Sequence, residues 1–163
     1  MAKYFMTKVQ PGQELILWGK SFGVATAIYL AMHNGNMFDK YIFESGFTSA
    51  PDAIAHNVNR FTCCLGRLFA SVTSISWRSI DRIQHLKQPI LFATGTADTT
   101  VPGRMSKELC EAAINSSHAR LYEVEGAGHN RLWCHPKATD YWEQLEDFLQ
   151  YKDSTVIQEN SRY

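Results

Sequence analysis

The fold of this chain is decided by the stretch Gly19-Lys20-Ser21-Phe22-Gly23, which lies between a strand-like run, Glu14 to Trp18, and a helical run, Val24 to Met32. The pattern G-x-S-x-G at such a junction is typical of a nucleophile elbow, in which a sharp turn exposes the serine hydroxyl. The serine of this turn takes a strained backbone conformation, and glycine on both sides avoids a clash between strand and helix. The motif predicts that Ser21 points toward a substrate. A serine before a helix is also a common N-cap, so the motif alone leaves both roles open.

The composition indicates one globular domain. The 163 residues are 45% hydrophobic, which is enough for one buried core. Sixteen basic and sixteen acidic residues cancel and are interspersed, so we expect no nucleic-acid partner. Residues 1–13 lack the apolar core of a signal peptide, and no run approaches the roughly 20 apolar residues of a membrane helix. We therefore expect a cytoplasmic protein that contacts a membrane peripherally, if at all.

The cysteines and histidines do not follow the spacing of a disulfide framework or a metal site. The cysteines, which we expect to be reduced, are Cys63, Cys64, Cys110 and Cys134. The histidines without metal-ligand spacing are His33, His56, His85, His118 and His135. The sequence therefore predicts neither a metal nor a cofactor.

Apolar runs of strand length alternate with amphipathic runs of helix length, a pattern typical of a parallel sheet with flanking helices. The predicted strands are Leu15–Trp18, Tyr41–Phe43, Ile90–Ala93 and Arg120–Val124. The predicted helices are 21–34, Gly103–Ala113 and Pro136–Tyr151. The alternation is interrupted at about residues 47–87, which we interpret as a short helical cap insertion. We expect one domain over residues 1–151 and a polar tail over 152–163.

Three chemically complementary residues follow predicted strands of this sheet: Ser21, Asp98 and His129. The carboxyl ends of parallel strands meet at one edge of the sheet, where ligands bind. A serine becomes a nucleophile when a histidine removes its proton, and a carboxylate holds that histidine in the required tautomer. Asp98 could instead be a turn residue, and His129 could be a loop histidine bonded to the backbone. Glu44, at another strand end, is the alternative acid.

Four motifs in order resemble the C-terminal part of an α/β-hydrolase, and in particular the Bem46-like serine hydrolases, which are related to acyl-protein thioesterases. The matching stretches are Ile16 to Gly23, Glu44 to Ser49, Gly95 to Asp98 and Glu125 to Asn130, and the resemblance covers residues 14–150. The resemblance implies Ser21 as nucleophile, Asp98 as acid, His129 as general base and acid, and the backbone N–H of Phe22 as an oxyanion donor.

The resemblance also implies what this sequence does not contain. The family's nucleophile follows the fifth of eight strands, whereas Ser21 follows the first predicted strand, so we expect an α/β-hydrolase fold that lacks its first four strands. The loop that supplies the second oxyanion N–H, often in a His-Gly segment, has no match here. The first strand, Leu15–Trp18, is then expected to be an exposed edge that invites pairing or self-association.

Two functions are consistent with these expectations. The first is a serine hydrolase that cleaves an ester or thioester, in an acylated protein or a lipid-like molecule, through an acyl-enzyme on Ser21. The alternative is a catalytically weak or inactive half-domain that acts by association or not at all. Phe47 and Trp77 either line an acyl pocket or pack against the underside of the cap.

Overall fold

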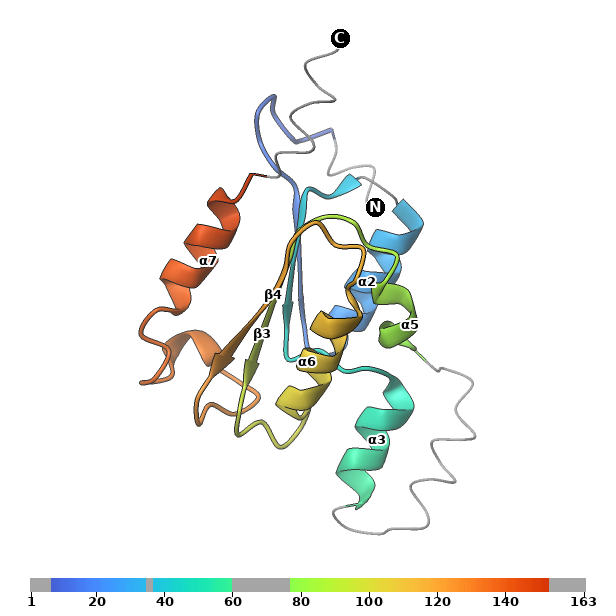
Figure 1. Ribbon diagram of the computed structural model, residues 1–163, viewed down its shortest axis with the longest axis vertical. Coiled ribbons are helices and arrows are strands. Elements are labelled where there is room, and N and C mark those ends of the chain that lie inside the picture. Colours follow the sequence, from blue (N-terminus) through green and yellow to red (C-terminus); the bar gives the residue numbers. More distant parts are fainter. Residues whose placement is uncertain (1–6, 35–36, 60–76, 153–163) are drawn as a thin grey trace.

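The computed structural model of the chain, which describes residues 7–34, 37–59 and 77–152, is built on a four-stranded parallel sheet (Figure 1). Its strands follow the order β1-β2-β3-β4. Their bounds are β1 Ile16–Lys20, β2 Lys40–Glu44, β3 Ile90–Gly95 and β4 Ala119–Val124. In register, Gly19 of β1 lies opposite Phe43 of β2. The predicted parallel sheet with flanking helices is confirmed.

Helices cover both faces of this sheet, as in a three-layer α/β arrangement (Figure 1). The helices are α2 Phe22–Asn34, α3 Ala50–Asn59, α5 Ser79–Ile83, α6 Gly103–Ala112 and α7 Tyr141–Gln150, with a short 3-10 turn, η2, at Leu132–Cys134. Helices α2, α5 and α6 bury one face, and α7 buries the other. Every residue of β2 and β3 is buried, which fits the mainly apolar stretches Tyr41–Phe43 and Ile90–Ala93 that these strands contain.

Strand β1 is an edge of the sheet in the part of the chain that the structure describes. It pairs with β2 alone, and most of its residues are half-buried or exposed. The expected exposed first strand is therefore present. The carboxyl end of this edge strand leads directly into Ser21.

An ion pair ties the start of the sheet to α7. The Lys40 side chain is 3% exposed, and its ammonium donates to Glu14 Oε2 at 2.7 Å and to the Leu149 carbonyl oxygen at 2.5 Å. Lys152 donates to the other Glu14 oxygen at 2.7 Å. The structure therefore neutralises a buried cation with a carboxylate that precedes β1.

The start of the final helix differs from the prediction. The final helix begins at Tyr141 rather than Pro136, because Leu132 and Ala138 are buried against α7 and hold the preceding segment in a loop. Tyr122 on β4 also donates to Asp140 Oδ1 at 2.6 Å and fixes the residue before the helix. The Tyr122 pKa is raised to about 12, by burial and by this bond.

The region expected as a cap, 47–87, contributes partly to the main core. Ile83 and Leu86 are buried in the same cluster as Phe43 and Phe92 of the sheet. Helix α5 therefore belongs to the layer formed with α2 and α6. Residues 60–76, including Cys63 and Cys64, lie outside the described residues, as does most of the predicted tail. None of the described helices is long and apolar enough to cross a membrane.

Candidate active site

Ser21 is the single residue between the end of β1 and the start of α2. Its φ of 52° lies in the left-handed region, which a non-glycine residue rarely adopts. The Ser21 N–H donates to the Glu44 carbonyl oxygen at 2.8 Å, and the Ser21 carbonyl oxygen accepts from the Val24 N–H at 3.0 Å. These bonds hold the strained turn and direct the serine side chain to the carboxyl edge of the sheet.

The two glycines of the elbow have different roles. A Cβ on Gly19 would lie 2.8 Å from the Gly23 carbonyl oxygen and 2.9 Å from Val24 Cα, closer than atoms can approach. A Cβ on Gly23 would meet nothing within 4 Å. The prediction that both positions need glycine for steric reasons is therefore wrong for Gly23, because a Cβ at this second position of α2 points into open space.

Asp98 lies in the loop after β3 with its side chain fully buried. Its Oδ1 accepts from the N–H groups of Thr100 and Val101 at 2.8 Å and 2.9 Å. Its Oδ2 lies 2.7 Å from His129 Nδ1. Sequence reasoning missed the two backbone donors, although Asp-x-Thr is a typical signal for such a turn. They orient the carboxylate toward the histidine.

His129 follows β4 and lies between the other two side chains. Its Nε2 is 2.9 Å from Ser21 Oγ. Since a carboxylate only accepts, Nδ1 carries the hydrogen that faces Asp98, and Nε2 is free to accept the serine proton. The loops after β3 and β4 approach closely because residue 95 is glycine: a Cβ there would lie 2.2 Å from the Ala127 carbonyl oxygen. The structure thus joins the three predicted residues in one hydrogen-bonded chain.

Glu44, the alternative acid, is directed elsewhere. Its Oε1 accepts from Trp18 Nε1 at 3.2 Å and from the Tyr141 hydroxyl at 2.5 Å, on the side of the sheet that α7 covers. Burial, followed by the bond to Glu44 and its charge, raises the pKa of Tyr141. Asp98, rather than Glu44, therefore faces His129.

The expected pocket residues lie beside the elbow. Phe47 is 4% exposed and packs with Ala25, Val101 and Met105, so it forms core. Trp77 is half-buried, and its ring lies 4.3 Å from the exposed ring of Phe22. The Phe22 N–H is the first of α2, where N–H groups have no acceptor within the helix. An apolar pair and a free donor therefore follow Ser21.

The described residues include no group of histidine, cysteine and acidic side chains that could hold a metal ion. Cys110 and Cys134 are free thiols, and burial, with the charge of Glu111, raises the pKa of Cys110. The hydrogen-bonded chain of Ser21, His129 and Asp98 has the geometry of a group that can carry out acyl transfer.

Comparison with known proteins places this geometry in context. No protein-family model matches the chain. The α/β-hydrolase domain-containing protein WAV2 of Arabidopsis thaliana is 27% identical over 144 residues, covering 83% of this chain and 46% of WAV2. Protein bem46 of Schizosaccharomyces pombe is 26% identical, and the match covers 86% of this chain and 44% of bem46. An uncharacterized membrane protein of Saccharomyces cerevisiae is 28% identical, and the match covers 84% of this chain and 46% of that protein. The chain thus spans less than half the length of these curated relatives.

Solved structures agree on the fold. An esterase of Pyrococcus furiosus has a TM-score of 0.68 at 17% identity, covering 91% of this chain and 58% of the esterase. A monoacylglycerol lipase of Paleococcus ferrophilus has a TM-score of 0.61 at 18% identity, covering 93% and 74%. At these identities the likeness establishes the fold alone.

Proposed function

We propose that this chain, which has the C-terminal part of an α/β-hydrolase fold and has Bem46 and WAV2 proteins as homologues, is a serine hydrolase that cleaves an ester or thioester through an acyl-enzyme on Ser21. The observation that carries the proposal is the chain of hydrogen bonds from Ser21 through His129 to the buried Asp98, at 2.9 Å and 2.7 Å. The strained φ of Ser21 supports it, because such strain persists where a structure requires it.

In the proposed reaction, His129 Nε2 removes the Ser21 proton while Oγ attacks the carbonyl carbon. Asp98 stays ionised, accepts a hydrogen bond from Nδ1–H and so stabilises the imidazolium. The oxyanion of the tetrahedral intermediate accepts a hydrogen bond from the Phe22 N–H. When the intermediate collapses, the alcohol or thiol leaves and takes the proton from His129. Water, activated by the same histidine, then hydrolyses the acyl-enzyme and frees Ser21.

The oxyanion site limits the expected rate. The elbow supplies one oxyanion donor, the Phe22 N–H. An oxyanion site that loses one of its donors typically becomes slower by about 10² to 10³ in rate. We therefore expect slow turnover by the chain alone. The apolar pair of Phe22 and Trp77 beside Ser21 favours an acyl chain rather than a charged substrate, in a lipid-like ester or an acylated protein.

A fluorophosphonate probe tests the proposal, because it forms a covalent bond with an activated serine. We expect the chain to be labelled and Ser21→Ala to lose the label. The matched control is Ser45→Ala: Ser45 also follows a strand with a positive φ of 49°, but it is fully buried and its hydroxyl has no partner among the described residues. A folded wild-type chain that takes no label refutes the proposal.

A second candidate is a weak or inactive half-domain that acts by association. The single-sided pairing of β1 among the described residues favours it, because an unpaired strand edge is a template for another strand. Analytical ultracentrifugation distinguishes the two: concentration-dependent association without labelling supports this candidate, and a labelled monomer contradicts it.

A further inference from the structure

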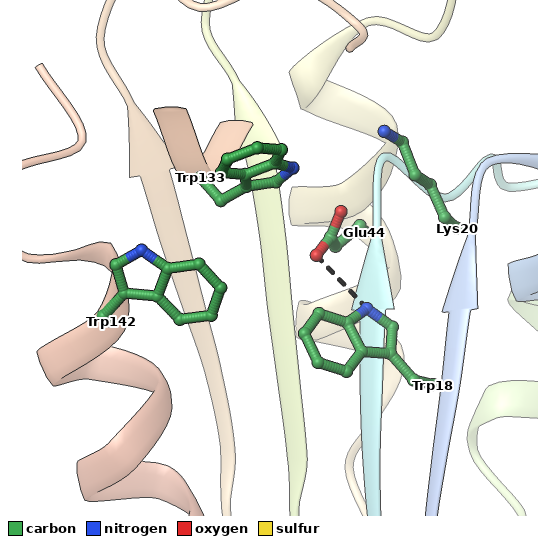
Figure 2. Close-up of a pocket in the computed structure, with 5 residues that line it drawn as sticks. All are labelled: Trp18, Lys20, Glu44, Trp133 and Trp142. Carbon is green, nitrogen blue, oxygen red and sulfur yellow. Dashed lines mark hydrogen bonds between the residues drawn. The ribbon is translucent and has the colours of Figure 1, made fainter. Parts of the chain in front are cut away.

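A pocket of about 390 Å³ opens on the sheet face that carries α7. Its lining residues come from four elements, β1, β2, η2 and α7: Trp18, Lys20, Glu44, Trp133 and Trp142 (Figure 2). The residues proposed for catalysis do not line it. The pocket is therefore a feature of its own, beside the candidate active site.

Three indole rings form most of its wall. Trp18, Trp133 and Trp142 are 47%, 50% and 56% exposed, although large aromatic side chains are usually buried much further. The rings of Trp133 and Trp142 lie 6.4 Å apart at 51° and form a corner. Indole faces carry negative electrostatic potential and attract cations, with tryptophan the strongest of the aromatic residues.

Glu44 forms the floor of the pocket. The residue is 3% exposed, and its Oε1 accepts from two neutral groups, the Trp18 N–H and the Tyr141 hydroxyl. None of the ion pairs among the described residues includes Glu44. Both of these hydrogen bonds use Oε1, and the other oxygen, Oε2, points away from the Trp18 indole (Figure 2). A buried carboxylate without a cation is costly, so a bound cation would relieve that cost.

Lys20 also lines the pocket, but it is exposed and does not pair with Glu44 within the described part of the chain. A lysine on a flexible stem keeps its ammonium in water. A solvated ammonium repels a cation in the pocket only weakly, and the removal of Lys20 is a direct test of whether the pocket selects positive charge.

We propose that this pocket binds an organic cation, an alkylammonium or guanidinium group, with its charge at Glu44 and its apolar surface against the three indoles. The proposal does not depend on the activity of Ser21. The cation can come from a free small molecule or from a basic side chain of a polypeptide that lies along the edge strand β1.

Intrinsic fluorescence gives a direct readout, because three of the four tryptophans line the pocket. The free-ligand probe is choline, with its uncharged isostere 3,3-dimethylbutan-1-ol as control. The side-chain probe is N-acetylarginine amide, with N-acetylcitrulline amide as control. We expect saturable changes with at least one cation and binding at least about tenfold weaker with its neutral partner. Saturation by choline assigns a small-molecule source, and saturation by the arginine derivative alone assigns a side-chain source.

Variants locate the site. We expect Glu44→Gln and Trp142→Ala each to weaken cation binding by about tenfold or more, and Lys20→Ala to leave it equal or tighter. The controls are Glu111→Gln and Tyr29→Ala, which change exposed residues of α6 and α2 on the opposite sheet face and should bind as wild type. If Glu44→Gln does not fold, the cation affinities of Trp142→Ala and Lys20→Ala test the proposal instead. Equal responses to charged and neutral probes, no response to either cation, or weaker binding in Lys20→Ala would overturn the proposal.

Discussion

The same substitution at the two glycines of the elbow should change stability in opposite directions. In Gly19→Ala, the new Cβ would meet the Gly23 carbonyl oxygen at 2.8 Å and Val24 Cα at 2.9 Å. An ordinary contact is 3.4 Å or more, so the overlaps are 3.4 − 2.8 = 0.6 Å and 3.4 − 2.9 = 0.5 Å. Both obstacles are backbone atoms at the start of α2, which cannot rotate away. Overpacking of this kind costs about 1 to 3 kcal/mol, and we expect the upper half of that range.

Gly23→Ala is the matched control. Its Cβ meets nothing within 4 Å, and its φ is not in the left-handed region. Alanine in a helix is favoured over glycine by about 0.5 to 1 kcal/mol, so this variant should be stabilised by about that amount.

Urea unfolding followed by circular dichroism measures both free energies of unfolding. Fluorophosphonate labelling should also slow by about tenfold or more in Gly19→Ala, because the strand end that carries Ser21 must shift relative to His129. The reasoning is refuted if Gly19→Ala is as stable as wild type, or if Gly23→Ala loses more than about 1 kcal/mol.

Two further predictions concern groups described above. Asp98→Asn should slow fluorophosphonate labelling by about 10³- to 10⁴-fold, because an amide that donates to Nδ1 selects the wrong tautomer of His129; labelling at the wild-type rate would contradict the assigned role of Asp98. Glu14→Gln should lower the free energy of unfolding at neutral pH by about 1 to 3 kcal/mol, because the buried Lys40 ammonium loses its anionic partner. Burial raises the pKa of Glu14, but hydrogen bonds from Lys152 and Lys40 outweigh it and lower the pKa overall. A lowered folded-state pKa gives stability that is present above the unfolded pKa and lost as the pH falls through the folded one, so the gap between wild type and Glu14→Gln should close on acidification. Urea unfolding at several pH values checks this, and a gap that stays constant down to about pH 3 would count against it.

The sequence was most informative where one local signal sufficed. The strands were predictable because apolar runs such as Ile90–Ala93 have no other location than the centre of a sheet. Ser21, Asp98 and His129 were predictable as neighbours because each follows a strand, and parallel strands end at one edge. Their catalytic roles remain predictions.

The remaining features depend on contacts between distant residues. The start of α7 was misplaced because Pro136 is a good helix start locally, but burial of Leu132 and Ala138 holds the segment in a loop. Gly19 on β1 faces the start of α2, whereas Gly23 within α2 faces open space, and the motif does not encode this difference. The tryptophan pocket joins side chains from β1, η2 and α7, which no periodicity connects.

The hydrogen bond between Ser21 and His129 joins residues 108 positions apart. Its two ends are carried by opposite edge strands, β1 and β4, so it forms only when the intervening strands are in register. Any partial opening of the sheet separates the pair before most of the secondary structure is lost. If Ser21 is the nucleophile that we propose, its covalent labelling reports cooperative folding of the whole sheet, and the label could follow the native fraction of this chain inside a cell.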